Sequence, residues 1–88
     1  MAEQEGFLAG ATRPPLTEGE WRVGVDFNPS QSLEVSAIKQ ATADLVDRLA
    51  TIASQPNTHP GARCAALAMT AYEEAAMWAV KAVTKKPR

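Results

Sequence analysis

The second half of the chain contains a long alanine-rich segment whose apolar side chains fall on two faces of a helix. Residues 61–84 contain no proline and, after Gly61, no glycine, so the segment favours one uninterrupted helix. The first face has heptad spacing and consists of Ala62, Ala65, Met69, Tyr72, Ala76, Ala79 and Val83. The second face consists of Cys64, Leu67, Ala71, Ala75, Trp78 and Ala82. A single partner helix can cover only one of these faces.

An earlier segment, residues 29–54, predicts a second amphipathic helix. Its apolar seam also has heptad spacing and consists of Val35, Ile38, Thr42, Leu45, Leu49 and Ile52. Asn28 is suited to cap this helix, Pro29 to its first position, and Gln31 to reach back as in a capping box. The stretch QPNTHPG, which follows Ser54, predicts a short loop between the two helices.

The two segments together predict an all-α fold, an antiparallel two-helix hairpin that forms a single domain over residues 21–88. Domains of this size bury only about 60% of their unfolded surface and often need a staple or a partner, and two helices alone would be marginally stable. The single Cys64 and the single His59 provide neither a disulfide nor a metal site. We therefore expect the second apolar face to pack against other copies of the chain in a homo-oligomer, where small alanines permit close approach.

The N-terminal part of the chain is less regular. Residues 1–20 are rich in Gly, Glu and Pro and predict a flexible arm. In the stretch WRVGVDF that follows, apolar residues alternate with Arg22, Gly24 and Asp26. The alternation is typical of a short strand, or of an extended segment laid over another subunit, and a plain extended lead-in to the helix explains it equally well. The prediction for residues 21–28 is an extended lead-in.

Charge and composition exclude several classes of protein. The formal net charge is −1, which argues against a DNA-binding or RNA-binding protein, because those usually carry a clear basic excess. The start, MAEQEGFLAG, is acidic where a signal peptide is basic, and no apolar run reaches membrane-spanning length. The sequence predicts a soluble intracellular protein.

The residues do not indicate catalysis. Cys64 and His59 have no evident orienting group or oxyanion donor, and there is no glycine-rich phosphate loop. Glu73 and Glu74 are adjacent, so on a helix they point about 100° apart and cannot form a carboxylate pair. We predict no enzymatic activity, no metal ion and no cofactor.

A polar stripe runs down the alanine-rich helix. At about 100° per residue, Arg63, Thr70 and Lys81 lie within about 20° of one another, and Glu74 and Met77 lie nearby. One interpretation is a solvated stripe in which Glu74 and Lys81 attract each other by a few tenths of a kcal/mol. The other is a ligand pocket, formed by cations and a hydroxyl where helices from different copies meet. Spacing alone supports both.

The stretches VGVDFNPS, IKQATADLVD and ARCAALAMTAYEEAAMWAVKAV together resemble the helical hairpin of phage anti-CBASS proteins, which one class of anti-Thoeris sponges shares. The resemblance covers about residues 22–86. Its most specific part is the spacing of Arg63 and Thr70 followed by MWAVKAV.

The resemblance implies a non-enzymatic sponge that assembles as a homohexamer. Such a protein sequesters cyclic oligonucleotide signals in the cytoplasm of an infected bacterium, so that defence effectors stay inactive. Carried over to this chain, Lys39 becomes a phosphate contact for cyclic dinucleotides, with Trp21 or Phe27 as the aromatic partner. Arg63 and Thr70 become contacts in a separate pocket for cyclic trinucleotides.

The chain departs from the family pattern at two places. Related sponges commonly have a tyrosine where only Trp21 or Phe27 is available here, and many have a tryptophan directly after the arginine, where this chain has Cys64. The second departure weakens the case for trinucleotides more than for dinucleotides. The alternative hypothesis is a structural or adaptor helical oligomer that binds no small molecule.

Overall fold

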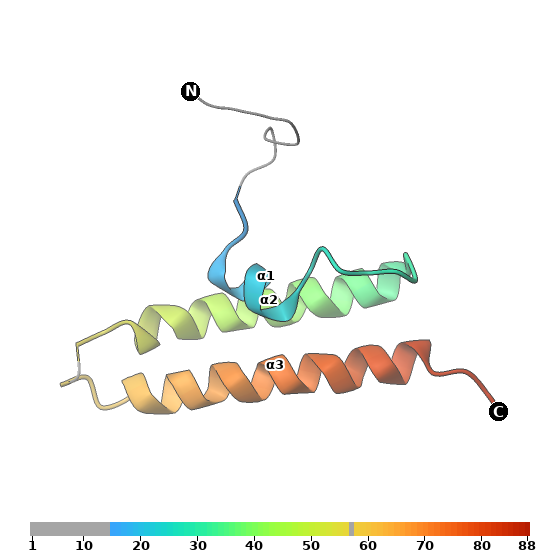
Figure 1. Ribbon diagram of the computed structural model, residues 1–88. Helices are drawn as coiled ribbons and strands as arrows, with labels where there is room; N and C mark the ends of the chain where they lie inside the picture. Colours follow the sequence, from blue (N-terminus) through green and yellow to red (C-terminus); the bar gives the residue numbers. More distant parts are fainter. Residues whose placement is uncertain (1–14, 57) are drawn as a thin grey trace, which may run out of the picture.

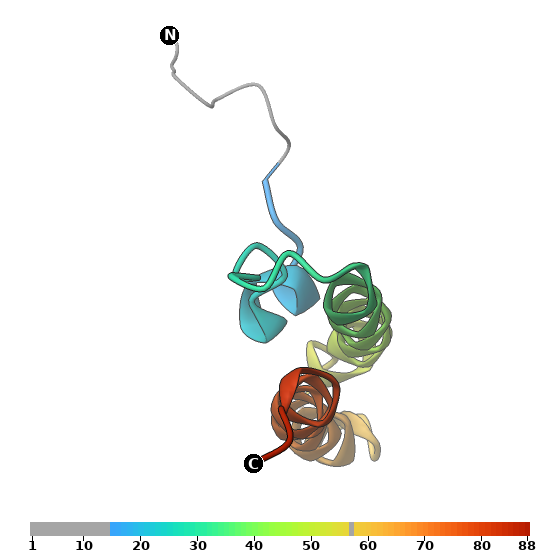
Figure 2. The ribbon, with the colours of Figure 1, turned by 90° about the vertical axis from the view of Figure 1, so that its right-hand side faces the viewer.

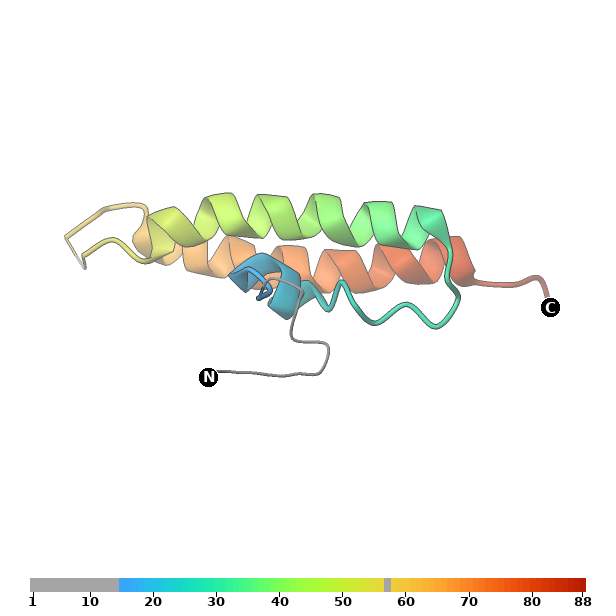
Figure 3. The same ribbon diagram turned by 90° about the horizontal axis from the view of Figure 1, so that it is seen from above.

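The computed structural model describes residues 15–56 and 58–88, and these form three helices: α1 (Glu18–Val23), α2 (Leu33–Ala53) and α3 (Ala62–Thr84). Helices α2 and α3 run antiparallel, side by side over most of their length (Figure 1). Viewed along the hairpin, α1 lies on one side of the pair, and the view from above confirms this position (Figures 2 and 3). The predicted all-α hairpin is thus confirmed, and the part of the chain described contains no strand.

The contact between α2 and α3 is made largely by small side chains. The buried apolar residues are Val35, Ala43, Val46, Ala65, Met69 and Ala76. The first apolar face predicted for α3 is confirmed, since its residues are buried or half-buried with the exception of Tyr72, which is exposed. Alanine at three of these six positions lets the two backbones approach closely, and the resulting core is thin.

The apolar seam predicted for α2 is partly wrong. The buried residues of α2 are Val35, Lys39, Ala43 and Val46, whereas Leu45 and Ile52 of the predicted seam are exposed. The buried stripe is rotated because α2 has two neighbours. Helix α1 covers the side near Ala43, so the seam is not determined by α3 alone.

The start of α2 also differs from the prediction of a helix over residues 29–54. Ser32 is the N-cap, and its side chain accepts a hydrogen bond from the Val35 N–H at 3.3 Å. Asn28 instead donates to the Ser32 carbonyl and the Ser36 hydroxyl, both at 2.9 Å. Gln31 has a φ of 56°, so it cannot lie in the helix or complete a capping box. The helix predicted over 61–84 agrees with α3, and Asn57 of the predicted loop lies outside the described residues.

Helix α1 corrects the predictions for the N-terminal region. Residues 1–14 of the expected arm lie outside the described residues, but 18–20 of that arm and 21–23 of the expected extended lead-in are helical. The start is a capping box. The Glu20 N–H donates to the Thr17 hydroxyl at 3.1 Å, and the Thr17 N–H donates to the Glu20 carboxylate at 3.0 Å. Gly24, with a φ of 76°, ends the helix in the left-handed conformation that glycine favours.

Helix α1 packs very closely on α2, and Gly19 makes this possible. The Gly19 N–H donates to the Asp47 carboxylate at 2.7 Å. A Cβ at position 19 would overlap the Ala43 carbonyl oxygen and would lie 2.9 Å from Asp47 Oδ1. Only glycine fits this crossing without a shift of the backbone.

The second apolar face of α3 has no cover within the described part of the protomer. All six of its residues are exposed, including Leu67 at 55% and Trp78 at 61%. The expectation that the hairpin leaves this face open is therefore confirmed.

Replacing Gly19 by alanine should release α1 from α2. The overlap with the Ala43 carbonyl should cost about 1–3 kcal/mol, the range found for overpacked sites. Hydrogen exchange measured by mass spectrometry should show the amides of residues 18–23 exchanging about tenfold faster or more. The control is Gly61→Ala, where the nearest contact of a new Cβ is the end of the His59 ring. Unchanged exchange in Gly19→Ala would contradict the packing described.

Candidate functional site

Lys39 is a buried cation in the first half of α2. It is 8% exposed, and its ammonium donates hydrogen bonds to the carbonyl oxygens of Gly24, at 3.0 Å, and of Phe27. Its Nζ also lies 5.4 Å from the centroid of the Phe27 ring, within range of a cation–π contact. An ammonium has three N–H donors, so one remains for another acceptor.

Two cavities flank this lysine, between the strap of residues 24–32 and the second half of α3. The larger has a volume of about 330 Å³ and is lined by Val23, Gly24, Phe27, Lys39, Ala76, Met77 and Val80. The smaller, of about 220 Å³, is lined by Phe27, Asn28, Pro29, Ser30, Val35, Lys39, Val80 and Thr84. Both cavities have largely apolar walls with one cation and one aromatic ring, a combination suited to an anionic ligand that carries a flat ring.

The two aromatic candidates differ in position. Phe27 lines both cavities and its ring faces the Lys39 ammonium, although the residue is 73% exposed. Trp21, on α1, is 72% exposed and lines neither cavity. The fold therefore brings Phe27, and not Trp21, to Lys39.

The polar stripe of α3 is exposed, as both interpretations of the sequence require. The Thr70 hydroxyl donates to the Ala66 carbonyl at 3.5 Å within its own helix. Lys81 lies 5.3 Å from the centroid of the Trp78 ring, and the Trp78 indole N–H donates to Glu74 at 3.4 Å. Glu74 and Lys81 thus contact Trp78 in place of the expected attraction to each other.

Sequence reasoning missed Arg22, which joins α1 to the stripe. Its Nη2 lies 3.3 Å from Glu73 Oε1 and 3.4 Å from the Thr70 hydroxyl, and its Nη1 lies 3.7 Å from Glu18 Oε2. The stretch TEGEWR could have predicted α1. Thr17 and Glu20 form a capping box, and Arg22 is a basic residue in the last turn, which together indicate a short helix. Arg63 is exposed near the start of α3.

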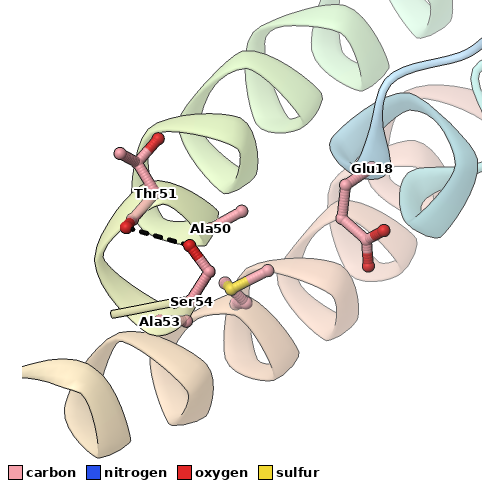
Figure 4. A pocket seen from close by; sticks show the side chains of 6 residues that line it. Glu18, Ala50, Thr51, Ala53 and Ser54 are labelled. Carbon is pink, nitrogen blue, oxygen red and sulfur yellow. Dashed lines mark hydrogen bonds between the residues drawn. The ribbon is translucent and has the colours of Figure 1, made fainter. Parts of the chain in front are cut away.

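A further cavity, between α1 and the end of α2, has the wrong chemistry for an anion. Its volume is about 550 Å³, and it is lined by Glu18, Ala50, Thr51, Ala53, Ser54 and Met69. The close view shows Glu18 on α1 and, across from it, the end of α2, where the Ser54 hydroxyl donates to the Thr51 carbonyl at 3.2 Å (Figure 4). Among the described residues that line it, the one charged side chain is the carboxylate of Glu18, so we place no anion site there.

The described residues contain neither a group of side chains suited to bind a metal ion nor a helix suited to span a membrane. Within residues 15–56 and 58–88, no group of three or more His, Cys, Asp or Glu side chains is placed to hold a metal ion. None of the described helices has the length and apolar character needed to cross a bilayer. His59 accepts a hydrogen bond from the Gly61 N–H at 3.0 Å through Nδ1, and Cys64 is an exposed free thiol.

The fold and the cleft define a small helical-hairpin protein with a buried cation, Lys39, between two largely apolar cavities. The family model of the Acb2/Tad1 hairpin domain matches residues 20–84, so the chain belongs to this family, that of the anti-CBASS and anti-Thoeris sponges. The family binds ligands and is not a family of enzymes. Neither curated proteins nor solved structures gave a match to the chain.

Replacing Lys39 by methionine should destabilise the fold. Methionine keeps the apolar stem but leaves the Gly24 and Phe27 carbonyls without their donor, which should cost about 1–3 kcal/mol. Urea unfolding followed by circular dichroism measures the change. Lys81→Met removes the same charge from an exposed position of α3 and serves as the control. Equal stability of Lys39→Met and the wild type would show that these hydrogen bonds contribute nothing.

Proposed function

We propose that this protein binds and sequesters cyclic oligonucleotide second messengers without cleaving them, so that CBASS-type defence effectors are not activated. The observation that carries the proposal is the buried Lys39 beside Phe27, between two apolar cavities, in a member of a sponge family. The site of action would be the cytoplasm of an infected bacterium.

The residues around Lys39 suit the parts of a cyclic dinucleotide. The remaining N–H of the ammonium can donate a hydrogen bond to one phosphate oxygen. Because the lysine is buried, the lower local dielectric strengthens that interaction. The exposed face of Phe27 serves as a stacking platform for a base, a contact worth about 1–3 kcal/mol in nucleic-acid sites. The apolar walls formed by Met77 and Val80 exclude water from the rest of the base.

One protomer gives this ligand too little surface. Ligand sites usually measure about 300–1,000 Å³, and the two cavities lie at or below the lower end of that range. A sponge has to compete with effector receptors for the ligand, so it needs a nanomolar Kd. Such a Kd corresponds to a binding free energy of about 12 kcal/mol. We infer that neighbouring copies complete the site, and that the chain assembles as a homohexamer through the open face of α3 that contains Leu67 and Trp78.

A second site, for cyclic trinucleotides, would lie on the polar stripe of α3. Arg63 and Thr70 are both exposed and lie on one side of the helix, about 10 Å apart along its axis. Arginine binds phosphate through two parallel hydrogen bonds, and the threonine hydroxyl offers another donor. Cys64 provides no base-stacking surface beside Arg63, so the ligand must find its stacking partner elsewhere.

The wild-type protein should bind at least one of cyclic di-AMP, cyclic GMP–AMP and cyclic tri-AMP with nanomolar affinity. Isothermal titration calorimetry measures the affinity, and chromatography after denaturation should recover the nucleotide intact. Ligand at about 1,000 times Kd should stabilise the fold by about 4 kcal/mol.

Two matched variants test the dinucleotide site in the same titration. Phe27→Leu should weaken binding of the dinucleotides by about 1–3 kcal/mol, whereas Trp21→Leu should leave it unchanged. Absence of binding to all three nucleotides at micromolar concentration would refute the proposal and favour the structural or adaptor oligomer. Recovery of linear products would refute sequestration.

Replacing Leu67 by glutamate should disrupt the assembly, because it places a charge on the open apolar face. Sedimentation velocity should show a wild-type oligomer and, in Leu67→Glu, at least a tenfold increase in the dissociation constant. Ala37→Glu adds the same charge to an exposed position of α2 and should keep the wild-type mass. A monomeric wild type at all concentrations tested would rule out the proposed assembly.

A further inference from the structure

The guanidinium of Arg22 is poorly satisfied where it lies. Its Nε is buried and has no hydrogen-bond partner. Of its remaining donors, Nη2 contacts Glu73 at 3.3 Å and Thr70 at 3.4 Å, and Nη1 lies 3.7 Å from Glu18. Hydrogen bonds between an arginine and a carboxylate are normally about 2.7–2.9 Å long. Arg22 is thus a fixed cation that makes only long contacts.

The position of Arg22 places this charge on the polar stripe. It contacts the hydroxyl of Thr70, one turn below Glu73 on α3, and Thr70 is exposed. The Thr70 hydroxyl donates its one proton to the Ala66 carbonyl at the long distance of 3.5 Å. A phosphate that replaces this carbonyl as the acceptor would lie beside the Arg22 guanidinium. The side chains of Arg22 and Glu73 are both partly exposed, so such a phosphate could reach between them.

We propose that Arg22 is a ligand-binding cation of the Arg63–Thr70 site, and that Glu73 is the counterion which a ligand phosphate displaces. The inference rests on the proposed function of that site. Arg22 and Arg63 would bind phosphates from two sides of Thr70, one from α1 and one from α3. Short charge-assisted hydrogen bonds to phosphate then replace the long contact with Glu73.

The ion pair with Glu73 also has a consequence for selectivity. A ligand has to compete with a carboxylate already held 3.3 Å from Arg22. Arg63 lies about 10 Å along α3 from Thr70, which Arg22 contacts. The larger ring of a cyclic trinucleotide would span this separation better than a dinucleotide ring would, and a dinucleotide bound at Lys39 does not need Arg22. Arg22 thus selects for cyclic trinucleotides at the stripe.

The two partners of the ion pair provide the test. Arg22→Gln should weaken the binding of cyclic tri-AMP about tenfold or more, and Glu73→Gln should strengthen it about threefold, because the competing carboxylate is gone. Both changes break the same ion pair, so a purely structural role would shift the affinity in the same direction in both variants. Titration calorimetry measures cyclic tri-AMP and cyclic di-AMP in parallel, and thermal unfolding verifies that each variant is folded.

Two controls complete the design. Arg48→Gln removes one positive charge from an exposed position of α2 and should leave both affinities within twofold of the wild type. Binding of cyclic di-AMP should also stay within twofold in Arg22→Gln. The inference is overturned if the two ion-pair variants shift affinity in the same direction, if neither shifts it, or if the wild type binds cyclic di-AMP but not cyclic tri-AMP. Failure of the wild type to bind any cyclic oligonucleotide refutes the proposed function itself.

Discussion

The ammonium group of Lys39 holds the segment between α1 and α2 against the hairpin, and the rest of the architecture depends on this interaction. Its two carbonyl partners, on Gly24 and Phe27, belong to a strap without helix or strand that would otherwise have few interior contacts. A buried charge needs such partners, because its desolvation is costly when it is not hydrogen-bonded. The same contact joins the end of α1 to α2 through Gly24 and places Phe27 between the two cavities.

The sequence predicted the hairpin well because its signals there are local and repeated. Residues of α3 follow a heptad pattern without breakers, and its bounds were predicted to within one residue. The start of α2 was predicted wrongly because several residues of NPSQS favour a cap, and only tertiary contacts decide that Ser32 is the N-cap while Asn28 stabilises the preceding turn. For the candidate site, the sequence predicted Lys39 and Phe27 as binding residues. It did not predict that they contact each other, because this contact depends on the path of the irregular strap, and no periodic pattern in the sequence determines that path.

The alanines of α3 let one face pack closely against α2, while the larger apolar residues lie on the opposite, exposed face. Small side chains let α2 approach one side closely, while Leu67 and Trp78 project from the other without cover in the protomer. The thin core contributes little stability by itself, since about 25 cal/mol is gained per Å² of apolar surface buried. The proposed assembly would therefore stabilise the fold and complete the ligand site through the same contacts.

The way in which the strap is anchored affects how readily the protein can diversify. Lys39 binds main-chain oxygens, and every residue type carries such an oxygen. These two hydrogen bonds thus place no demand on the side chain at position 27, which lines both cavities. A substitution at position 27 can therefore reshape the lining of the cleft while the main-chain anchor stays in place. If the proposed function holds, such a change would give a lineage under changing selection a route to new ligand preferences.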